Sequence, residues 1–184
     1  SELVYGKKHI SIASLSGMKE RTILINGFSK AFAMTGWRLG YAAGPAPLLK
    51  EMTKIHQYAI MCPPTMSQYA GIEALKNYDI SVPKMVDEYE KRRNYLLSSL
   101  TKMKLPFIVP EGAFYIFVNI QEFGLTSEEL ALRLLNEAKV VVVPGTAFGK
   151  RGEGFIRLSY AYSVQDLEKA LSRIGEWVKK ERGE

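Results

Sequence analysis

The sequence has few of the residue types that form disulfides or bind soft metals. Its 184 residues include one cysteine, Cys62, and two histidines. A single cysteine excludes a disulfide framework within the chain, and a zinc site built from cysteine and histidine is not expected, so we expect no metal. Scarce cysteine is also typical of proteins from a reducing compartment, which predicts a cytoplasmic location.

Long apolar runs are missing as well. No stretch of the sequence approaches the roughly 18 apolar residues that a membrane-spanning helix requires. The first residues, Ser-Glu-Leu-Val-Tyr-Gly-Lys-Lys, lack the apolar core of a secretory signal peptide. We therefore expect no membrane partner.

The charge is positive, which raises nucleic acid as a partner. The formal net charge is +6 and the isoelectric point is about 9.3. The densest cationic groups, residues 91–93 and 179–182, fall within helical patterns beside glutamates, which indicates solvated helix faces. No basic segment is interleaved with aromatic residues, so we expect no nucleic-acid partner. A basic nucleic-acid-binding domain stays the weakest alternative, and salt-dependent DNA binding would support it.

The most informative segment is residues 26–41, Asn-Gly-Phe-Ser-Lys-Ala-Phe-Ala-Met-Thr-Gly-Trp-Arg-Leu-Gly-Tyr. Lys30 has apolar neighbours, which predicts partial desolvation of its amine and favours the neutral form. A neutral amine attacks carbonyl carbons and forms Schiff bases. Ser29 and Arg38 offer a hydroxyl and a five-donor cation, a pair suited to phosphate. This combination is typical of a pyridoxal 5′-phosphate site. The alternative is a structural lysine that extends its ammonium to water.

The same residues resemble a known family. Ser29-Lys30, Gly36-x-Arg38, Gly40-Tyr41 and Gly44-Pro45 resemble the cofactor-lysine segment of the class I/II aminotransferases, which are fold-type I pyridoxal-phosphate enzymes. Residues 29–40 resemble the prokaryotic aspartate and aromatic branch in particular. The resemblance implies that Lys30 is catalytic and binds the cofactor covalently, and that Ser29 and Arg38 bind its phosphate. It also implies a homodimer whose substrates are an amino acid, aspartate or aromatic, and a 2-oxo acid.

A second candidate lies near the end of the chain. Residues 155–161, Phe-Ile-Arg-Leu-Ser-Tyr-Ala, place Arg157 in an otherwise apolar strand. A buried arginine requires an anionic partner, because it does not deprotonate. The alternative is a structural salt bridge. The segment resembles the aminotransferase strand that holds the substrate α-carboxylate, which implies that role for Arg157. Residues 110–115 and 143–149 resemble the two preceding family segments.

Hydrophobic patterns divide the chain into parts. Residues 22–28 and 39–43 are predicted to form buried strands, with a loop at residues 29–30, and 47–61 and 66–76 to form helices. A long helix follows, with Ser81 as N-cap and Pro83 in its first turn. Residues 1–79 have too few strands for a stable sheet, so we expect them to be the incomplete end of a large α/β domain. Residues 80–104 then form a connecting helix.

The remaining residues, 105–184, are predicted to form a small α+β domain. Strands are expected at 107–109, 113–120, 140–143 and 155–160. Two helices are expected to begin at capping boxes, Thr126 to Glu129 and Ser163 to Asp166. The predicted class is therefore α/β followed by α+β, with the helices packed on one face of the second sheet.

Parts of the family's site are not found in this sequence. The family needs an acid on the pyridine nitrogen and a tyrosine and an asparagine on the phenolic oxygen, and these come earlier in its chains. The sequence begins with residues that resemble those just after that segment, and Glu2 and Tyr5 do not occupy the motif positions. We therefore expect the C-terminal half of an aminotransferase, inactive alone. The alternative is a non-catalytic remnant or interaction domain, which cofactor absorbance would distinguish.

Overall fold

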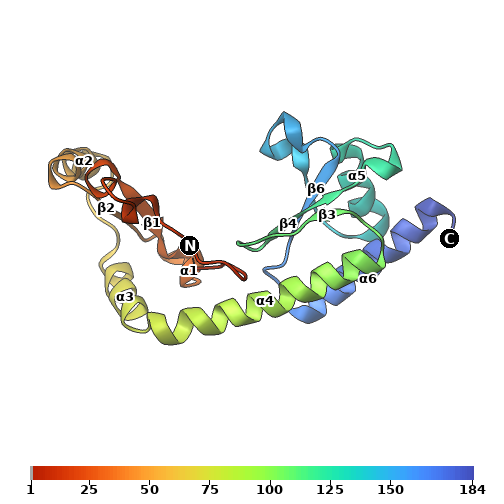
Figure 1. The fold of residues 1–184 in the computed structure, drawn as a ribbon, viewed down its shortest axis with the longest axis horizontal. Coiled ribbons are helices and arrows are strands. Elements are labelled where there is room, and N and C mark those ends of the chain that lie inside the picture. The colour runs from red at the N-terminus through yellow and green to blue at the C-terminus, as the bar shows by residue number, and fades with distance from the viewer. Residues whose placement is uncertain (1) are drawn as a thin grey trace. The chain divides into compact units, whose positions relative to one another are not determined.

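The computed structural model describes residues 2–184, and the chain divides into two compact units, Ser1–Val86 and Asp87–Glu184. The division falls within the longest helix, α4 (Tyr78–Lys102), which contains residues of both units (Figure 1). Among the described residues, no helix combines the length and apolar character that crossing a membrane requires. The three-part division at residues 79 and 104 stays a prediction for the whole protein.

The first unit contains the two strands and two helices predicted before the long helix. Strands β1 (Leu24–Gly27) and β2 (Gly40–Ala43) pair antiparallel, with Asn26 opposite Tyr41. The remaining elements are η1 (Ile12–Ser14), η2 (Lys19–Arg21), α1 (Phe28–Ala31), η3 (Thr35–Trp37), α2 (Ala46–Ala59) and α3 (Thr65–Lys76). Pro64 precedes α3, so the double proline separates α2 from α3 as expected.

Three expectations for this unit were wrong. The strands are not buried: every residue of β2 is exposed and Ile25 of β1 is 77% exposed. In the described chain, β1 and β2 form a separate two-stranded sheet, which is too small to bury its own faces. Residues 29–30 lie in the helical turn α1 rather than in a loop. Ser81 does not begin the long helix, which starts at Tyr78 and contains Pro83. A proline near a helix start removes only one intrahelical hydrogen bond, so the helix continues through it.

The second unit contains a four-stranded antiparallel sheet in the order β3-β4-β6-β5. Its strands are β3 (Phe107–Ile108), β4 (Tyr115–Asn119), β5 (Val143–Pro144) and β6 (Phe155–Ser159). Its helical elements after α4 are η4 (Gln121–Phe123), α5 (Ser127–Arg133), the π-helix η5 (Leu134–Ala138), η6 (Gly145–Phe148), η7 (Lys150–Gly152) and α6 (Val164–Arg182).

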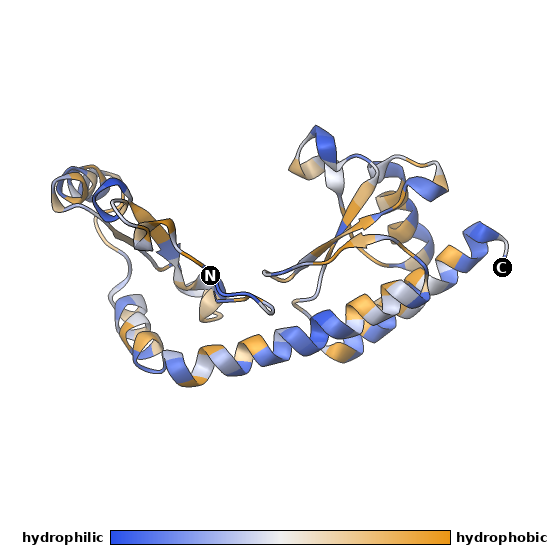
Figure 2. Ribbon diagram, in the orientation of Figure 1, coloured by the Kyte–Doolittle hydropathy of each residue, from blue (hydrophilic) through white to orange (hydrophobic). Residues whose placement is uncertain are grey.

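The two central strands give this sheet two different faces. Successive residues of a strand point to opposite faces. Ile116, Val118, Ile156 and Leu158 are buried, whereas the residues between them are half-buried. Helix α6 contributes five buried residues to the same core, Leu167, Leu171, Ile174, Trp177 and Val178. The predicted α+β arrangement is therefore observed in this unit, and Figure 2 shows apolar residues along β4 and β6 and an alternating pattern along α6.

The capping predictions succeed to different degrees. Thr126 and Glu129 form both hydrogen bonds of a capping box at the start of α5. At the start of α6, Ser163 Oγ accepts from the Asp166 amide at 3.1 Å, but the bond in the other direction is not found in the described chain. Aspartate is one methylene shorter than glutamate, which explains why its carboxylate bonds the Ser163 hydroxyl instead.

The predicted strand at residues 140–143 is mostly absent, and only Val143 joins β5, with Pro144. The Val140 amide donates to the carbonyl of Leu134 at 3.1 Å, so it closes the end of η5 rather than pairing with a strand. Val140 and Val142 are still buried, as an alternating extended segment requires. Burial was therefore predicted correctly from the four valines, whereas strand pairing was not.

Residues 87–184 are expected to fold without the rest of the chain, whereas 105–184 are not. Leu96 and Leu100 of α4 are 1% and 0% exposed, so the core of the second unit needs residues that precede position 105. Truncating one such leucine costs about 2–5 kcal/mol, against a total of about 5–15 kcal/mol for a domain. Urea denaturation followed by circular dichroism should show a cooperative transition for 87–184 only. Equal midpoints for the two fragments would contradict this expectation.

Candidate active site

Lys30 lies on α1, the single helical turn that follows β1. Phe28 and Ala31 are three residues apart on this turn and are 4% and 6% exposed, so they form its buried side. Lys30 lies outside that side and is exposed. The predicted desolvation of Lys30 is therefore wrong for the described chain, because Phe28 and Ala31 face the interior and do not surround it.

Ser29 and Arg38 both lie in the connection between β1 and β2, residues 28–39, which includes α1 and η3 and which we call the lysine loop. Thr35 links the two residues. The hydroxyl of Thr35 donates to the carbonyl of Ser29 at 3.0 Å, and Arg38 Nη1 donates to the carbonyl of Thr35 at 2.9 Å. Arg38 has a left-handed backbone, with φ of 50°. Its guanidinium makes no other hydrogen bond within residues 2–184, so four of its five N–H donors stay available. A hydroxyl, an amine and a guanidinium on one loop fit a phosphorylated aldehyde such as pyridoxal phosphate.

Helix α3 packs against the lysine loop. Ser67 is 4% exposed, and its hydroxyl donates to the carbonyl of Trp37 at 2.7 Å, directly before Arg38. Gly71 lies one turn further along α3 and is buried. A methyl group at Gly71 would lie 2.5 Å from Leu39 Cδ2 and 3.5 Å from the ring of Phe28. The helix therefore approaches both ends of the lysine loop closely, and a glycine permits that approach.

Arg157 lies on β6, on the half-buried face of the second unit's sheet. It pairs with Phe117 of β4 and with Val143 of β5. Its guanidinium carbon lies 4.2 Å from the ring centre of Tyr115 and 4.7 Å from that of Phe148. Its Nε is buried and has no hydrogen-bond partner in the described chain. The alternative role for Arg157, a structural salt bridge, is therefore not found within residues 2–184.

Glu153 is the acid nearest to Arg157 in the preceding sequence, and it is occupied elsewhere. Its Oε1 accepts from the Ser127 amide at 2.8 Å, the Gly154 amide at 2.9 Å and the Ser127 hydroxyl at 3.0 Å. These bonds, the Ser127 amide first, hold the pKa of the Glu153 carboxyl below its ordinary value. Glu153 thus joins the start of α5 to the start of β6, and it does not pair with Arg157 within residues 2–184.

Phe148 reaches Arg157 because two glycines bring its loop into a tight turn. A Cβ on Gly145 would overlap the carbonyl of Gly152, and a Cβ on Gly152 would overlap the carbonyl of Gly145. The backbones of η6 and η7 therefore touch, and Phe148, at the end of η6, packs edge-on against Phe117 with ring centres 5.5 Å apart.

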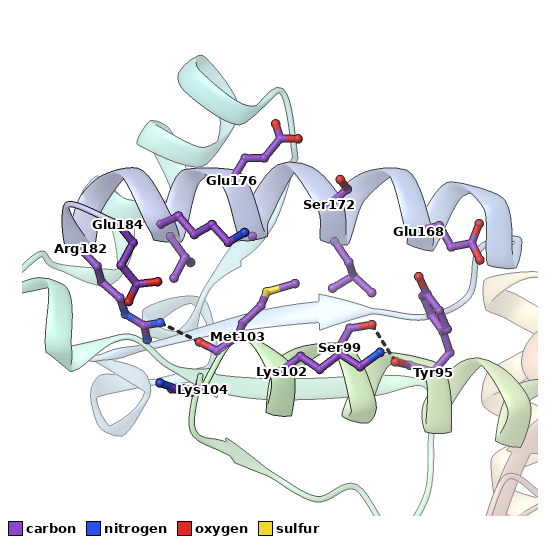
Figure 3. A pocket seen from close by; sticks show the side chains of 14 residues that line it. Tyr95, Ser99, Lys102, Met103, Lys104, Glu168, Ser172, Glu176, Arg182 and Glu184 are labelled. Atoms are coloured by element: carbon purple, nitrogen blue, oxygen red, sulfur yellow. Dashed lines mark hydrogen bonds between the residues drawn. The ribbon is translucent and has the colours of Figure 1, made fainter.

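Two cavities of the second unit are each lined in part by helix α6. The first cavity, of about 520 Å³, lies between α4 and α6 and is lined by side chains of both charges (Figure 3). One of these residues, Arg182, donates a hydrogen bond to the carbonyl of Met103. This cavity contains none of the predicted site residues. The other, about 560 Å³, lies between α6 and residues 140–143 and includes Arg157 in a mostly apolar lining. No group of three or more metal-ligating residues is found among residues 2–184.

The comparison with known proteins decides the family. A sequence model of the family described as aminotransferase class I and II matches residues 1–174. The chain belongs to this aminotransferase family. Its resemblance to the family, predicted from the lysine segment and Arg157, is therefore confirmed.

Relatives of this aminotransferase chain include enzymes named for two kinds of substrate. It is 52% identical over 169 residues to an aspartate aminotransferase of Pyrococcus abyssi, covering 91% of this chain and 43% of that protein. It is 49% identical over 179 residues to aromatic-amino-acid aminotransferase 2 of Thermococcus litoralis, covering 96% and 46%. The solved aromatic aminotransferase of Pyrococcus horikoshii matches with 47% identity and a TM-score of 0.93, covering 98% and 49%. The chain thus spans about half the length of the relatives it matches.

The structure places the predicted site residues of this aminotransferase chain in both units. Ser29, Lys30 and Arg38 share one loop of the first unit, and Arg157 lies in the second. Sequence reasoning missed Thr35 and Ser67, which hold that loop through hydrogen bonds to carbonyl groups. A hydroxyl residue inside the motif could have indicated Thr35, whereas Ser67 is 30 positions from its partner and has no local signal.

Gly71→Ala is expected to destabilise the whole protein by about 1–3 kcal/mol, because the added methyl group overlaps Leu39. Gly175→Ala is the matched control, since Gly175 is also inside a helix and its Cβ would meet Met103 no closer than 3.5 Å. The control should be neutral or stabilise by up to about 1 kcal/mol, through helix propensity. The free energy of unfolding, measured in urea, checks both. Equal effects of the two substitutions would contradict the close packing at Gly71.

Proposed function

We propose that the whole protein is a pyridoxal-phosphate-dependent aminotransferase that transfers an amino group between an aspartate or aromatic amino acid and a 2-oxo acid, with 2-oxoglutarate as the acceptor. The lysine loop is the observation that supports this most strongly. It contains the exposed residue Lys30, its sequence neighbour Ser29, and Arg38, whose guanidinium makes one hydrogen bond within residues 2–184, in a chain of the aminotransferase family.

Each residue has a stated task in this proposal. Pyridoxal phosphate, when bound, supplies an aldehyde for the amino group and an electron sink for the reaction. Ser29 and Arg38 bind the phosphate, as a hydroxyl donor and a charged fork. Lys30 would hold the cofactor covalently, and its amine, when free, would act as the base that takes the proton from the substrate Cα. Arg157 holds the α-carboxylate of either substrate.

Residues 1–184 alone are proposed to be a poor catalyst. The family's acid for the pyridine nitrogen and its partners for the phenolic oxygen are not assigned to any residue of this sequence. Without that acid, the ring is a weaker electron sink. The exposed strands of the first unit support the same proposal, since apolar strands such as β1 are stable only when other layers cover them. We also propose that the whole protein is cytoplasmic.

A homodimer is part of the proposal as well. Tyr58, Ile60 and Met61, at the end of α2, are 94%, 68% and 78% exposed. Neighbouring apolar side chains with such exposure mark an interaction surface. They support the subunit contact that the family resemblance implies.

Borohydride reduction of the whole protein loaded with pyridoxal phosphate should fix a pyridoxyl group on Lys30, detectable by peptide mass spectrometry. Lys30→Ala should remove the label and lower kcat by about 10²–10⁴-fold or more, since the general base is lost. Lys76→Ala is the control, because Lys76 is exposed on α3 and pairs with Glu73 on the same helix. A label on another lysine, with Lys30 unmodified, would refute the assignment, and a protein that binds no cofactor would favour a non-catalytic remnant.

Arg157→Lys should weaken the binding of amino acid and 2-oxo acid together, and leave cofactor affinity unchanged. Lysine keeps the charge but not the fork, and a hydrogen bond to a charged group contributes about 1.5–3 kcal/mol, or about 10- to 150-fold in KM. Arg151→Lys, on exposed η7, is the matched control. Steady-state kinetics and cofactor titration measure the two effects. Lost cofactor affinity with unchanged KM would assign Arg157 to the phosphate site instead.

A further inference from the structure

Arg157 is held by aromatic rings instead of an acid. Tyr115 comes from β4 and Phe148 from the end of η6, and both rings lie within 5 Å of the guanidinium carbon, at 4.2 and 4.7 Å. We call Tyr115 and Phe148 the aromatic clamp. Within residues 2–184, no carboxylate pairs with Arg157, and the nearest preceding acid, Glu153, is bound to Ser127 and Gly154.

This kind of contact differs from a salt bridge in its effect on a ligand. A carboxylate would neutralise the guanidinium and occupy its N–H donors. An aromatic ring attracts the cation through the negative face of its π system, while the charge and the donors remain. The clamp therefore fixes Arg157 and leaves it able to bind an anion.

The nitrogens of the Arg157 guanidinium differ in their burial. Nε is fully buried and has no partner in the described chain. The two Nη atoms are neither bonded to described residues nor fully buried, so they keep their donors and some exposure. A carboxylate can then bind end-on, across Nη1 and Nη2, with one oxygen on each nitrogen.

Both rings are themselves held by neighbours. Tyr115 contacts Phe114, with ring centres 4.3 Å apart, and Phe148 contacts Phe117 at 5.5 Å. Phe117 lies directly opposite Arg157 in the sheet. The clamp is therefore built before a substrate arrives, and a long side chain fixed in advance loses less entropy on binding.

We propose that Tyr115 and Phe148 are positioning residues, which orient Arg157 so that its Nη1–Nη2 edge meets the α-carboxylate of both substrates. This role rests on the proposed aminotransferase function. Part of the affinity for amino acid and 2-oxo acid then comes from two uncharged residues. Neither of them bonds the carboxylate.

The test replaces each ring in the whole, cofactor-loaded protein. Tyr115→Leu and Phe148→Leu should raise KM for amino acid and 2-oxo acid alike, by about 2- to 30-fold, with kcat and cofactor affinity unchanged. The substitutions Tyr115→Phe and Phe148→Tyr keep an aromatic ring, so each variant should have the wild-type KM. Phe123→Leu is the control, because Phe123 contacts Trp177 and not Arg157. If Tyr115→Leu does not fold, Phe148→Leu carries the test, since Phe148 is 51% exposed.

A double-mutant cycle separates positioning from packing. In an Arg157→Gln background there is no cation for the rings to hold, so Phe148→Leu should change KM no further. If the enzyme is active, two results would refute the positioning role of Tyr115 and Phe148. One is that the effects of Arg157→Gln and Phe148→Leu on KM are fully additive. The other is that the leucine variants leave KM unchanged. A wild-type protein that transfers no amino group from aspartate or aromatic amino acids would overturn the proposed function, and the clamp's role with it.

Discussion

The two-residue period of β4 and β6 is the constraint on which the second unit depends. It directs Ile116, Val118, Ile156 and Leu158 to the helices and leaves Phe117 and Arg157 facing each other on the opposite face. A shift of β6 by one residue would turn Arg157 into the core and expose Ile156 and Leu158. The register that forms the core is therefore the same register that presents Arg157.

The first unit is organised differently, because its strands have no second layer within the described residues. In this unit, helix α3 fixes the lysine loop. It packs closely against the loop at Gly71, and Ser67 donates a hydrogen bond to the carbonyl of Trp37. The loop itself stays exposed. The chain matches 43% and 46% of the length of two relatives.

Much of this structure could be predicted from the sequence, where local patterns determine it. The apolar spacing located β4, β6 and α6, and the Thr-x-x-Glu pattern located the start of α5. The predictions failed where distant residues decide the outcome. The exposure of Lys30 depends on which side of one helical turn is buried, and Val140 bonds back to η5 instead of joining a strand. The contact between Phe148 and Arg157 depends on a loop that returns through two touching glycines, which no local pattern indicates.

Those glycines have a consequence for how sequence variation near the site is interpreted. Gly145 and Gly152 touch no charged group of the site, yet any side chain at either position would separate η6 from η7 and carry Phe148 away from Arg157. A substitution there would resemble an active-site defect in its kinetics, although the altered residue contacts no substrate. If few substitutions are tolerated at Gly145 and Gly152, the reason would therefore be the close approach of the two backbones. It would not be a direct role of either glycine in catalysis.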